Sequence, residues 1–250
     1  MSDKVKNLHN TPSGGGGMNV VITGASKGIG KATAEIFAAN GYNLYLCSRN
    51  ENALYKAMEE LVMRFRAVTI KATPFELSKK ESAIAFGNWL LSQGISLDVL
   101  FNNAGSFEPG SVHEEADGAL EKQIETNLYS AYHLTRAVLP QMIKQKRGHI
   151  FNMCSVASIK AYSNGGSYSI SKTALYSFSK NLREEMKPHN IKVTTIIAGA
   201  AYTDSWAKSG IDKTRFMQAE DIAKMIYAAS QLSPQACVEE ILMRPQLGDL

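Results

Sequence analysis

A tyrosine and a lysine lie four residues apart, as Tyr168 and Lys172, in the segment GGSYSISKTALYSFSK of residues 165–180. Side chains at this spacing are neighbours on a helix, so the ammonium of Lys172 can stabilise a phenolate on Tyr168. A phenol normally has a pKa of about 10, and bringing it to neutrality requires about 4 kcal/mol of preferential stabilisation of the phenolate. The pair predicts a general acid that delivers a proton to a carbonyl oxygen while a cofactor supplies hydride.

Ser155 lies thirteen residues before Tyr168, at the end of HIFNMCS, residues 149–155, which is expected to form a strand. The carboxyl ends of parallel strands form the edge where open α/β sheets bind ligands, so the Ser155 hydroxyl can hold a substrate oxygen. The chain has ten tyrosines, and a Tyr–Lys pair at helical spacing is more often a surface feature. The combination of residues, rather than any single one, indicates catalysis.

The segment TGASKGIG, residues 23–30, follows the first apolar run of the chain and leads into the first helical stretch. Glycines here let the chain turn tightly, bring backbone N–H groups against a pyrophosphate and allow the helix to pack closely on the strand. An ordinary strand-to-helix turn with capping glycines would show the same spacing. In this context we expect a dinucleotide site, with the candidate binding residues Gly24, Ser26, Lys27, Gly28, Ile29 and Gly30.

From residue 18 onward, short β-rich apolar runs alternate with longer helical stretches, the pattern of βαβ units around a parallel sheet. This unbroken alternation predicts a single α/β domain over 18–250, preceded by a flexible leader or tag-like tail over 1–17. The expected strands cover 19–23, 43–48, 67–73, 97–102, 149–155, 192–198 and 239–244. The expected helices cover 28–40, 51–64, 78–93, 116–145, 166–187 and 219–231.

Four features occur together in this chain: glycines spaced GxxxGxG, the segment NNAG at 102–105, Ser155, and Tyr168 with Lys172 as YxxxK. In order and spacing they resemble the short-chain dehydrogenase/reductase family, from about residue 18 to the C-terminus. The resemblance implies a Rossmann-type, doubly wound, seven-stranded parallel sheet with helices on both faces, a nicotinamide cofactor, and homodimers or homotetramers. It also implies that Asn127 is a fourth catalytic residue, which supports a water chain from Lys172 to solvent.

Further binding positions follow from the same resemblance. On the adenosine side of the cofactor it adds Asn103, Ala104 and Gly105. After the expected sixth strand the family usually has Pro-Gly and then a Thr that contacts the cofactor, whereas this chain reads IIAGAAYTD. Ala198 replaces the proline, while Gly199 and Thr203 keep their places. Residues 204–214, with Trp206 as their only large aromatic, are expected to form a mobile lid over the substrate.

The end of the second expected strand reads CSRN. An enzyme that selects NAD usually places an acidic side chain here for the ribose 2′-hydroxyl, whereas a 2′-phosphate requires cations. Ser48 and Arg49 occupy the place of the acid, and Lys27 precedes the second glycine of the turn, so two cations could clamp a phosphate. Both could instead be exposed helix-end residues. We expect NADP, with NAD possible. Glu76, followed by Leu77, stands where the family usually has an Asp near the adenine.

The formal net charge of +4 over 250 residues is small, and the most basic run, KQKRGH at 144–149, lacks the interleaved aromatics of a nucleic-acid-binding surface. Cys47, Cys154 and Cys237 show neither CxxC nor Cys/His ligand spacing, so we expect no disulfide framework and no metal site. Residues 1–17 lack the apolar run of a signal peptide, and no later segment has the apolar length of a membrane span. We expect a cytoplasmic protein that binds neither nucleic acid nor membrane.

These features predict an NADPH-dependent oxidoreductase that interconverts a small carbonyl compound, such as a ketone or β-keto thioester, and a secondary alcohol. Tyr168 would be the general acid and base. The alternative is a cofactor-binding regulator without turnover, although intact Ser155, Tyr168 and Lys172 argue against it, because a sensor needs no acid. Substrate-pocket residues are expected from 106–115 and from the lid, and neither segment carries a charge pattern that names a substrate.

Overall fold

The strands of the protein form one parallel sheet. The computed structural model describes residues 17–203, 206 and 210–250. Within them, seven strands pair in the order β3-β2-β1-β4-β5-β6-β7, as expected for a Rossmann-type fold. The strands are β1 (Asn19–Thr23), β2 (Asn43–Ser48), β3 (Ile70–Pro74), β4 (Val99–Asn102), β5 (Gly148–Met153), β6 (Ile191–Ala198) and β7 (Glu240–Met243). The expected leader up to residue 16, and part of the expected lid, lie outside the described residues.

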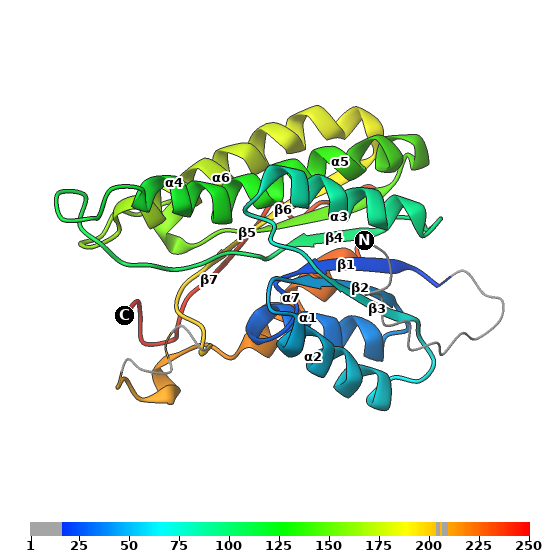
Figure 1. Ribbon diagram of the computed structural model, residues 1–250, viewed down its shortest axis with the longest axis horizontal. Helices are drawn as coiled ribbons and strands as arrows, with labels where there is room; N and C mark the ends of the chain where they lie inside the picture. The colour runs from blue at the N-terminus through cyan, green and yellow to red at the C-terminus, as the bar shows by residue number, and fades with distance from the viewer. Residues whose placement is uncertain (1–16, 204–205, 207–209) are drawn as a thin grey trace.

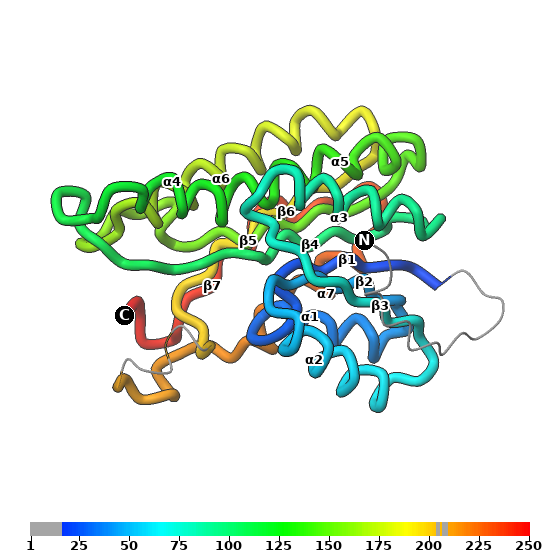
Figure 2. Tube along the Cα trace, viewed as in Figure 1, coloured from blue at the N-terminus to red at the C-terminus, as the bar shows by residue number. Residues whose placement is uncertain are grey.

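Helices cover both faces of the sheet (Figure 1). One face carries α1 (Gly28–Ala39), α2 (Glu51–Arg64) and α7 (Ala219–Ser230). The other carries α3 (Lys80–Ser92), α4 (Ala119–Ile124), the π-helical turn η1 (Glu125–Tyr129), α5 (Ser130–Gln145) and α6 (Gly166–Met186). Short 3-10 turns are η2 (Val156–Ser158), η3 (Lys187–His189) and η4 (Lys213–Arg215). Figure 2 shows that the blue N-terminal helices share their side of the sheet with α7, which lies late in the chain.

Alternate residues of each strand face opposite helical layers. In β1, Val20 and Ile22 belong to the same core cluster as Phe37 of α1, whereas Val21 belongs to the cluster that contains Phe86 of α3. All five residues of β1 are buried. Because the sheet is covered on both faces, the centre of β1 has three consecutive apolar residues rather than an alternation of apolar and polar ones.

The order of the strands reverses at β1. This strand pairs in parallel with β2 on one side and with β4 on the other, so that Val20 is aligned with both Leu44 and Val99. The chain leaves β1 and β4 towards opposite faces of the sheet, which opens a crevice at their carboxyl ends. The glycine turn follows β1 and NNAG follows β4, so both predicted binding segments reach this crevice.

The helix expected over 116–145 is interrupted in the structure. It begins at Ala119, and residues Glu125–Tyr129 form a turn with π-helical hydrogen bonding before α5 continues. The interruption contains Asn127, whose buried side chain bonds to the backbone of Ser106. A π turn adds one residue to the helical repeat, which the hydrophobic pattern of the sequence does not reveal.

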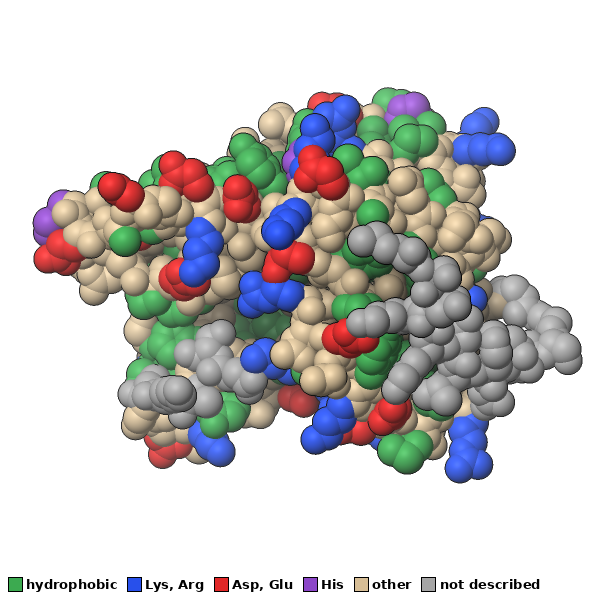
Figure 3. Space-filling model, in the orientation of Figure 1, with side chains coloured by type: hydrophobic (Ala, Val, Ile, Leu, Met, Phe, Trp, Pro, Cys, Tyr) green, Lys and Arg blue, Asp and Glu red, His purple; other side chains and the backbone are tan. Residues whose placement is uncertain are grey.

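The surface seen in Figure 3 carries charges of both signs. Lys and Arg side chains alternate there with Asp and Glu. Ion pairs among the described residues include Lys31 with Glu60 and Arg64 with Glu35, the latter at 3.0 Å. Among the side chains that the structure describes, this face therefore has no extended patch of one sign.

His149 is a buried histidine in β5. Its ring stacks on Phe151, with 3.9 Å between the ring centroids, and its Nε2 lies 2.7 Å from the hydroxyl oxygen of Thr194. That hydroxyl donates its only hydrogen to the carbonyl of Val238, so Nε2 must carry a proton and donate it to Thr194. Nδ1 is buried and has no hydrogen-bond partner among the described residues. Burial lowers the pKa of His149 to about 3, so the ring is neutral at pH 7.

The protein is expected to lose stability as the pH falls from 6.5 towards 3. A histidine in the unfolded chain binds a proton near pH 6.5, whereas His149 in the folded chain does so only near pH 3. The unfolded state therefore binds more protons in this window, which removes up to about 5 kcal/mol from the free energy of unfolding. Between pH 7 and pH 4.5, urea unfolding should show that the free energy of unfolding of His149→Gln falls by about 3 kcal/mol less than that of the wild type. Equal losses in both proteins would contradict this.

Candidate active site

A groove of about 890 Å³ runs along the carboxyl ends of the central strands. It begins at the glycine turn after β1 and passes the ends of β2, β4, β5 and β6. Most of the predicted site residues line it: Gly24, Ser26, Lys27, Gly28, Ile29, Ser48, Arg49, Glu76, Leu77, Asn103, Ala104, Gly105, Ser155, Tyr168, Lys172, Gly199 and Thr203. Gly30, a predicted cofactor-binding residue, and Asn127, a predicted catalytic residue, do not line the groove themselves.

Gly30 shapes the glycine turn from behind. A Cβ at this position would lie 2.3 Å from the carbonyl oxygen of Gly24, so only a residue without a side chain allows the first turn of α1 to pack this closely on the end of β1. Asn103 donates from Nδ2 to the carbonyl oxygens of Thr23 at 2.9 Å and of Gly24 at 3.2 Å. The Thr23 hydroxyl accepts from the backbone N–H groups of Asn103 and Ala104. NNAG and the glycine turn thus form one connected wall.

The end of β2 reaches the same groove. The hydroxyl oxygens of Ser26 and Ser48 lie 3.0 Å apart, so a hydrogen bond joins the glycine turn to β2. The guanidinium of Arg49 lies 3.4 Å from the carboxylate of Glu76, and 76% of the Arg49 side chain is exposed. Lys27 also lines the groove. Both predicted cations therefore border the cavity, and Glu76 partly balances the charge of Arg49.

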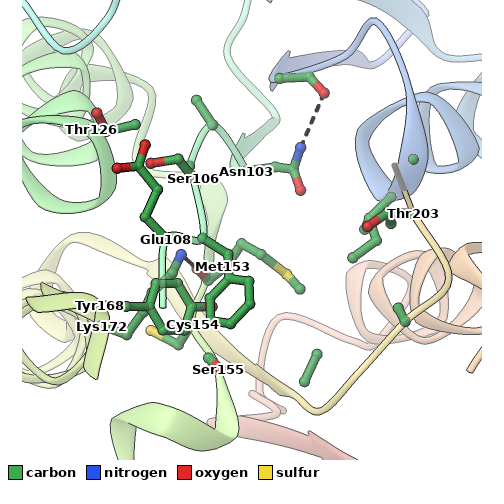
Figure 4. A pocket seen from close by; sticks show the side chains of 18 of the residues that line it. Asn103, Ser106, Glu108, Thr126, Met153, Cys154, Ser155, Tyr168, Lys172 and Thr203 are labelled. Atoms are coloured by element: carbon green, nitrogen blue, oxygen red, sulfur yellow. Dashed lines mark hydrogen bonds between the residues drawn. The ribbon is translucent and has the colours of Figure 1, made fainter. Parts of the chain in front are cut away.

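Ser155, Tyr168 and Lys172 converge on the groove beyond the end of β5 (Figure 4). Ser155 caps η2, where its hydroxyl accepts a hydrogen bond of 3.2 Å from the backbone N–H of Ala157. On α6, the Nζ of Lys172 lies 5.9 Å from the centre of the Tyr168 ring. Lys172 donates a hydrogen bond of 2.7 Å to the carbonyl of Met153, the last residue of β5. Lys172 is thus anchored on the strand that precedes Ser155.

The acidity of Tyr168 differs from the expectation drawn from the sequence. Burial raises the pKa of Tyr168 to about 12, opposed by a hydrogen bond with Ser155. Burial lowers the pKa of Lys172 to about 8. At neutral pH the phenol is therefore protonated and the amine is charged. In the protein alone, desolvation of a phenolate outweighs the stabilisation that the neighbouring ammonium could give it.

Asn127 lies close to Lys172 behind the groove wall. Its Oδ1 accepts from the backbone N–H of Ser106 at 2.9 Å, and its Nδ2 donates to the hydroxyl of Ser171 at 3.0 Å. A Cβ on Gly105 would lie 2.8 Å from Asn127 Oδ1 and 3.3 Å from Lys172 Nζ, so the glycine leaves the space between these two atoms open. Asn127 fixes the chain that follows NNAG, and its part in a water chain stays a prediction.

The turn after β6 lacks the usual proline but is held by the neighbouring strand. The N–H of Gly199 donates to the carbonyl of Met243, at the end of β7, at 2.8 Å. Thr203 lies against the glycine turn, since a Cβ on Gly28 would meet its methyl group at 3.2 Å. A hydrogen bond to β7 therefore restrains the turn in which the sequence has no proline.

The segment 106–115 reaches the groove through its first three residues, Ser106, Phe107 and Glu108. His113, in the same segment, points to solvent, with 78% of its side chain exposed. Lining residues that the sequence did not single out come from other elements: Lys122, Thr126, Ser130, Met153, Tyr162 and Asp249. Met153 is the last residue of β5, so its place at the carboxyl end of a strand could have indicated that it lines the groove. Whether Lys122, Thr126 and Ser130 line the groove depends on which face of their helix turns towards it.

The cysteines are free thiols. Cys154 lines the groove next to Ser155, and burial raises its pKa to about 12, so it is a protonated, weakly reactive group. Among the described residues, no three His, Cys, Asp or Glu side chains are grouped so that they could bind a metal ion. None of the helices described is long and apolar enough to cross a bilayer.

Comparison with protein families matches residues 18–214 to short chain dehydrogenase. A curated relative, dehydrogenase/reductase SDR family member 7B of Xenopus tropicalis, is 35% identical over 189 residues, which cover 74% of this chain and 61% of that protein. The NADPH-dependent 1-acyldihydroxyacetone phosphate reductase of Saccharomyces cerevisiae is 33% identical over 197 residues, 78% of this chain and 64% of that protein. The chain therefore spans about three fifths of the length of these two relatives.

Solved structures with the same fold match nearly the whole chain. An alcohol dehydrogenase from the archaeon Thermococcus sibiricus, complexed with 5-hydroxy-NADP, has a TM-score of 0.85 and 27% identity, covering 92% of this chain and 97% of that one. L-sorbose reductase from Gluconobacter frateurii, complexed with NADPH and L-sorbose, has a TM-score of 0.85 and 27% identity, covering 91% and 95%. With the family match extending over the glycine turn, NNAG and the Ser155, Tyr168 and Lys172 cluster, the chain belongs to the short-chain dehydrogenase/reductase family of oxidoreductases.

Proposed function

We propose that the protein is an NADPH-dependent oxidoreductase that interconverts a small carbonyl compound and the corresponding secondary alcohol. The observation that carries this proposal is the convergence of Ser155, Tyr168 and Lys172 on the groove that begins at the glycine turn. A protein that only senses a dinucleotide needs no protonated phenol beside its binding groove.

The groove has the chemistry that a phosphorylated dinucleotide requires. Helix α1 begins at Gly28 in the groove wall, so its free N–H groups and the positive end of its dipole favour a pyrophosphate there. Strand β2 ends at Ser48 and is followed by Arg49, a hydroxyl and a cation where selection of NAD would call for an acid. The volume of about 890 Å³ is within the range of small-molecule sites. These residues would hold the cofactor along the crevice between β1 and β4.

The relatives support the choice of NADPH over NADH. The two similar solved structures carry an NADP derivative and NADPH, and the yeast relative is named as NADPH-dependent. Lys27 and Arg49 line the groove in this chain, and two cations suit a 2′-phosphate, which is a dianion, better than a hydroxyl.

Ser155, which follows β5, and Tyr168 and Lys172 of α6 provide the proton chemistry. When bound, NADPH supplies a hydride to the carbonyl carbon. Tyr168 donates its phenolic proton to the carbonyl oxygen as negative charge grows there, and the Ser155 hydroxyl orients that oxygen by a hydrogen bond. The ammonium of Lys172 then stabilises the phenolate that remains. Tyr168 is protonated at neutral pH, which is the state needed to reduce a carbonyl compound. Oxidation of an alcohol requires the phenolate instead.

The proton of Tyr168 is restored through Lys172. The space that Gly105 leaves open between Lys172 Nζ and Asn127 Oδ1 provides two polar partners for a water molecule. In this proposal Asn127 positions that water and so connects Lys172 to solvent.

A turnover assay tests the proposed function. Purified protein is mixed with NADPH and a panel of ketones, β-keto thioesters and quinones, and the loss of reduced cofactor is followed by absorbance. We expect turnover with at least one class of carbonyl compound. Tight binding of NADPH without turnover on any of them would overturn the proposal in favour of a cofactor-sensing regulator.

Reversing the charge of Arg49 is expected to raise the KM for NADPH about 10- to 100-fold, because a hydrogen bond between charged groups contributes about 1.5–3 kcal/mol. Arg49→Glu removes this bond to the 2′-phosphate and adds a repelling carboxylate, whereas NADH presents only a hydroxyl. Steady-state kinetics with both cofactors at a fixed carbonyl concentration measures the effect. Arg64→Glu reverses an exposed charge on α2 outside the groove and is the matched control. Equal changes for NADPH and NADH in Arg49→Glu would contradict the phosphate contact.

A further inference from the structure

Three aromatic rings lie together at the catalytic end of the groove. The ring of Phe107 meets that of Tyr168 edge to face, with the centroids 4.8 Å apart and an interplanar angle of 76°. Phe107 also stacks on Trp206, with the centroids 5.7 Å apart and an angle of 25°. All three residues line the groove, and we call them the aromatic wall.

The aromatic wall is assembled from segments far apart in the chain. Phe107 follows β4, Tyr168 belongs to α6, and Trp206 follows β6. Trp206 is backed by Phe216, a buried residue whose ring centroid lies 5.3 Å away. The wall therefore rests on a packed residue behind Trp206 and presents aromatic surface to the groove.

The surroundings of the catalytic hydroxyls are also largely apolar. Further lining residues near Ser155 in the chain are Val156, Ala157 and Tyr162. Of the charged side chains in the lining, Lys172 belongs to the catalytic cluster, and Lys27, Arg49 and Glu76 lie at the glycine turn and the ends of β2 and β3. The others, Glu108, Lys122, Lys160 and Asp249, belong to exposed residues, and Glu108 is paired with Lys122 at 2.7 Å. A carbonyl held by Ser155 and Tyr168 would thus carry its substituents into a space bordered by rings, with the charges at its rim.

We propose that the preferred substrates are carbonyl compounds conjugated to a planar ring, such as aryl ketones, and that Phe107 and Trp206 select them. The inference rests on the proposed function and names its substrate class. Aromatic pairs are favoured at centroid separations of about 4.5–7 Å in stacked or edge-to-face arrangements, which is the geometry that the wall already has. A planar ring can add to this arrangement. A saturated ring of the same size is thicker and has no π-quadrupole, so it cannot make these stacked or edge-to-face contacts with Phe107 and Trp206.

Acetophenone and cyclohexyl methyl ketone form a matched pair of substrates, because both join a methyl ketone to a six-carbon ring and differ in planarity and conjugation. The ratio of kcat/KM for acetophenone to that for cyclohexyl methyl ketone is measured with NADPH in the wild type and in Phe107→Leu and Trp206→Leu. Comparing these ratios between proteins cancels the intrinsic reactivity of the two ketones. We expect each substitution to lower the ratio about 5- to 10-fold, as the loss of one aromatic pair predicts.

Tyr202→Leu is the control for these variants. Tyr202 packs on Phe216, as Trp206 does, with its ring centroid 5.7 Å away, but it does not line the groove. We expect Tyr202→Leu to keep the wild-type ratio within about twofold, since it removes no ring from the groove. A ratio that is unchanged in both Phe107→Leu and Trp206→Leu would overturn the inference.

Calorimetric titration of each ketone into the protein saturated with NADP⁺ separates this inference from the proposed function. Tighter binding of acetophenone than of cyclohexyl methyl ketone, with the difference lost in Trp206→Leu, supports aromatic selection whether or not turnover is seen. Equal affinities in the wild type, including no detectable binding of either ketone, would overturn it. Failure of the proposed function alone would appear as selective binding of acetophenone without turnover of any carbonyl compound.

Discussion

Tyr168→Phe is expected to lower kcat by a factor of about 10³, while the Kd for NADPH changes by less than about threefold, because general acid catalysis typically contributes 10²–10⁴ in rate. The substitution removes one oxygen and keeps the ring that packs on Phe107 and lies beside Lys172. The groove therefore retains its shape, but the growing negative charge on the substrate oxygen has no proton donor. Steady-state kinetics gives kcat, and a fluorescence titration of NADPH gives the Kd.

Tyr176 provides a matched control on the same helix. Tyr176 and Lys180 repeat the four-residue spacing, with Lys180 Nζ 5.1 Å from the centre of the Tyr176 ring, but the Tyr176 hydroxyl bonds to Glu240 outside the groove. Tyr176→Phe is expected to keep kcat within about twofold of the wild-type value, because it removes no proton donor from the site. Activity of Tyr168→Phe above about a tenth of the wild-type value would show that another group supplies the proton.

Lys172→Met is expected to lower kcat about 100-fold, because a positive charge beside a phenol changes its pKa by about one to three units and the phenolate left after proton transfer would lose that stabilisation. Methionine fills a similar volume without the charge. The hydrogen bond from Lys172 to the carbonyl of Met153 is lost with it, so the end of β5 also loses an anchor. Kinetic measurements at saturating NADPH separate the loss in kcat from any change in cofactor affinity. A kcat within about threefold of the wild type would exclude this role for the ammonium.

The same variant carries a prediction for stability in alkaline solution. In the folded chain the pKa of Lys172 is lowered by burial to about 8, whereas in the unfolded chain it is about 10.4. Between these values the unfolded chain binds more protons, so the free energy of unfolding of the wild type rises with pH relative to that of Lys172→Met. The expected gain is about 3 kcal/mol. The folded Tyr168 has a pKa of about 12, and loss of the neighbouring charge can only raise it, so the phenol stays protonated up to pH 10.5 in both proteins and adds little to the difference.

Urea unfolding at pH 7 and pH 10.5 measures this gain. Lys180→Met removes an exposed lysine from the same helix and should follow the wild type over the whole range. Parallel pH dependence of the wild type and Lys172→Met would mean that the amine keeps its ordinary pKa of about 10.4 in the folded protein, which would contradict its desolvation by burial.

The two YxxxK pairs of α6 show what sequence could and could not predict about the site. Their spacing is identical. Only the order and spacing relative to Ser155, NNAG and the glycine turn indicate that Tyr168 is the catalytic phenol. The structure adds the physical difference: Lys172 is 5% exposed, whereas Lys180 lies on the solvent side of the helix. Burial of the Tyr168 phenol also reverses the predicted direction of its pKa, because desolvation depends on neighbours that no local pattern contains.

The fold was more predictable than the substrate end of the groove. Strands such as Asn19–Thr23 are short runs with an apolar centre, followed by turn residues, so each could be located to within a few residues. Their alternation with helices predicts the parallel sheet. The aromatic wall has no such signal. Phe107 and Trp206 are separated by about a hundred residues, and each lies in irregular chain where hydrophobic periodicity gives no information on direction.

The place of β1 at the centre of the sheet has a consequence for biosynthesis. Its partner β2 is made shortly after it, but its other edge is completed only when Val99–Asn102 has left the ribosome, because the chain emerges from its N-terminus. Until then the nascent chain exposes an unpaired strand edge with the apolar side chains Val20, Val21 and Ile22, the kind of surface that pairs with other chains. During the interval between the synthesis of these two strands, β1 is therefore open to pairing with other chains.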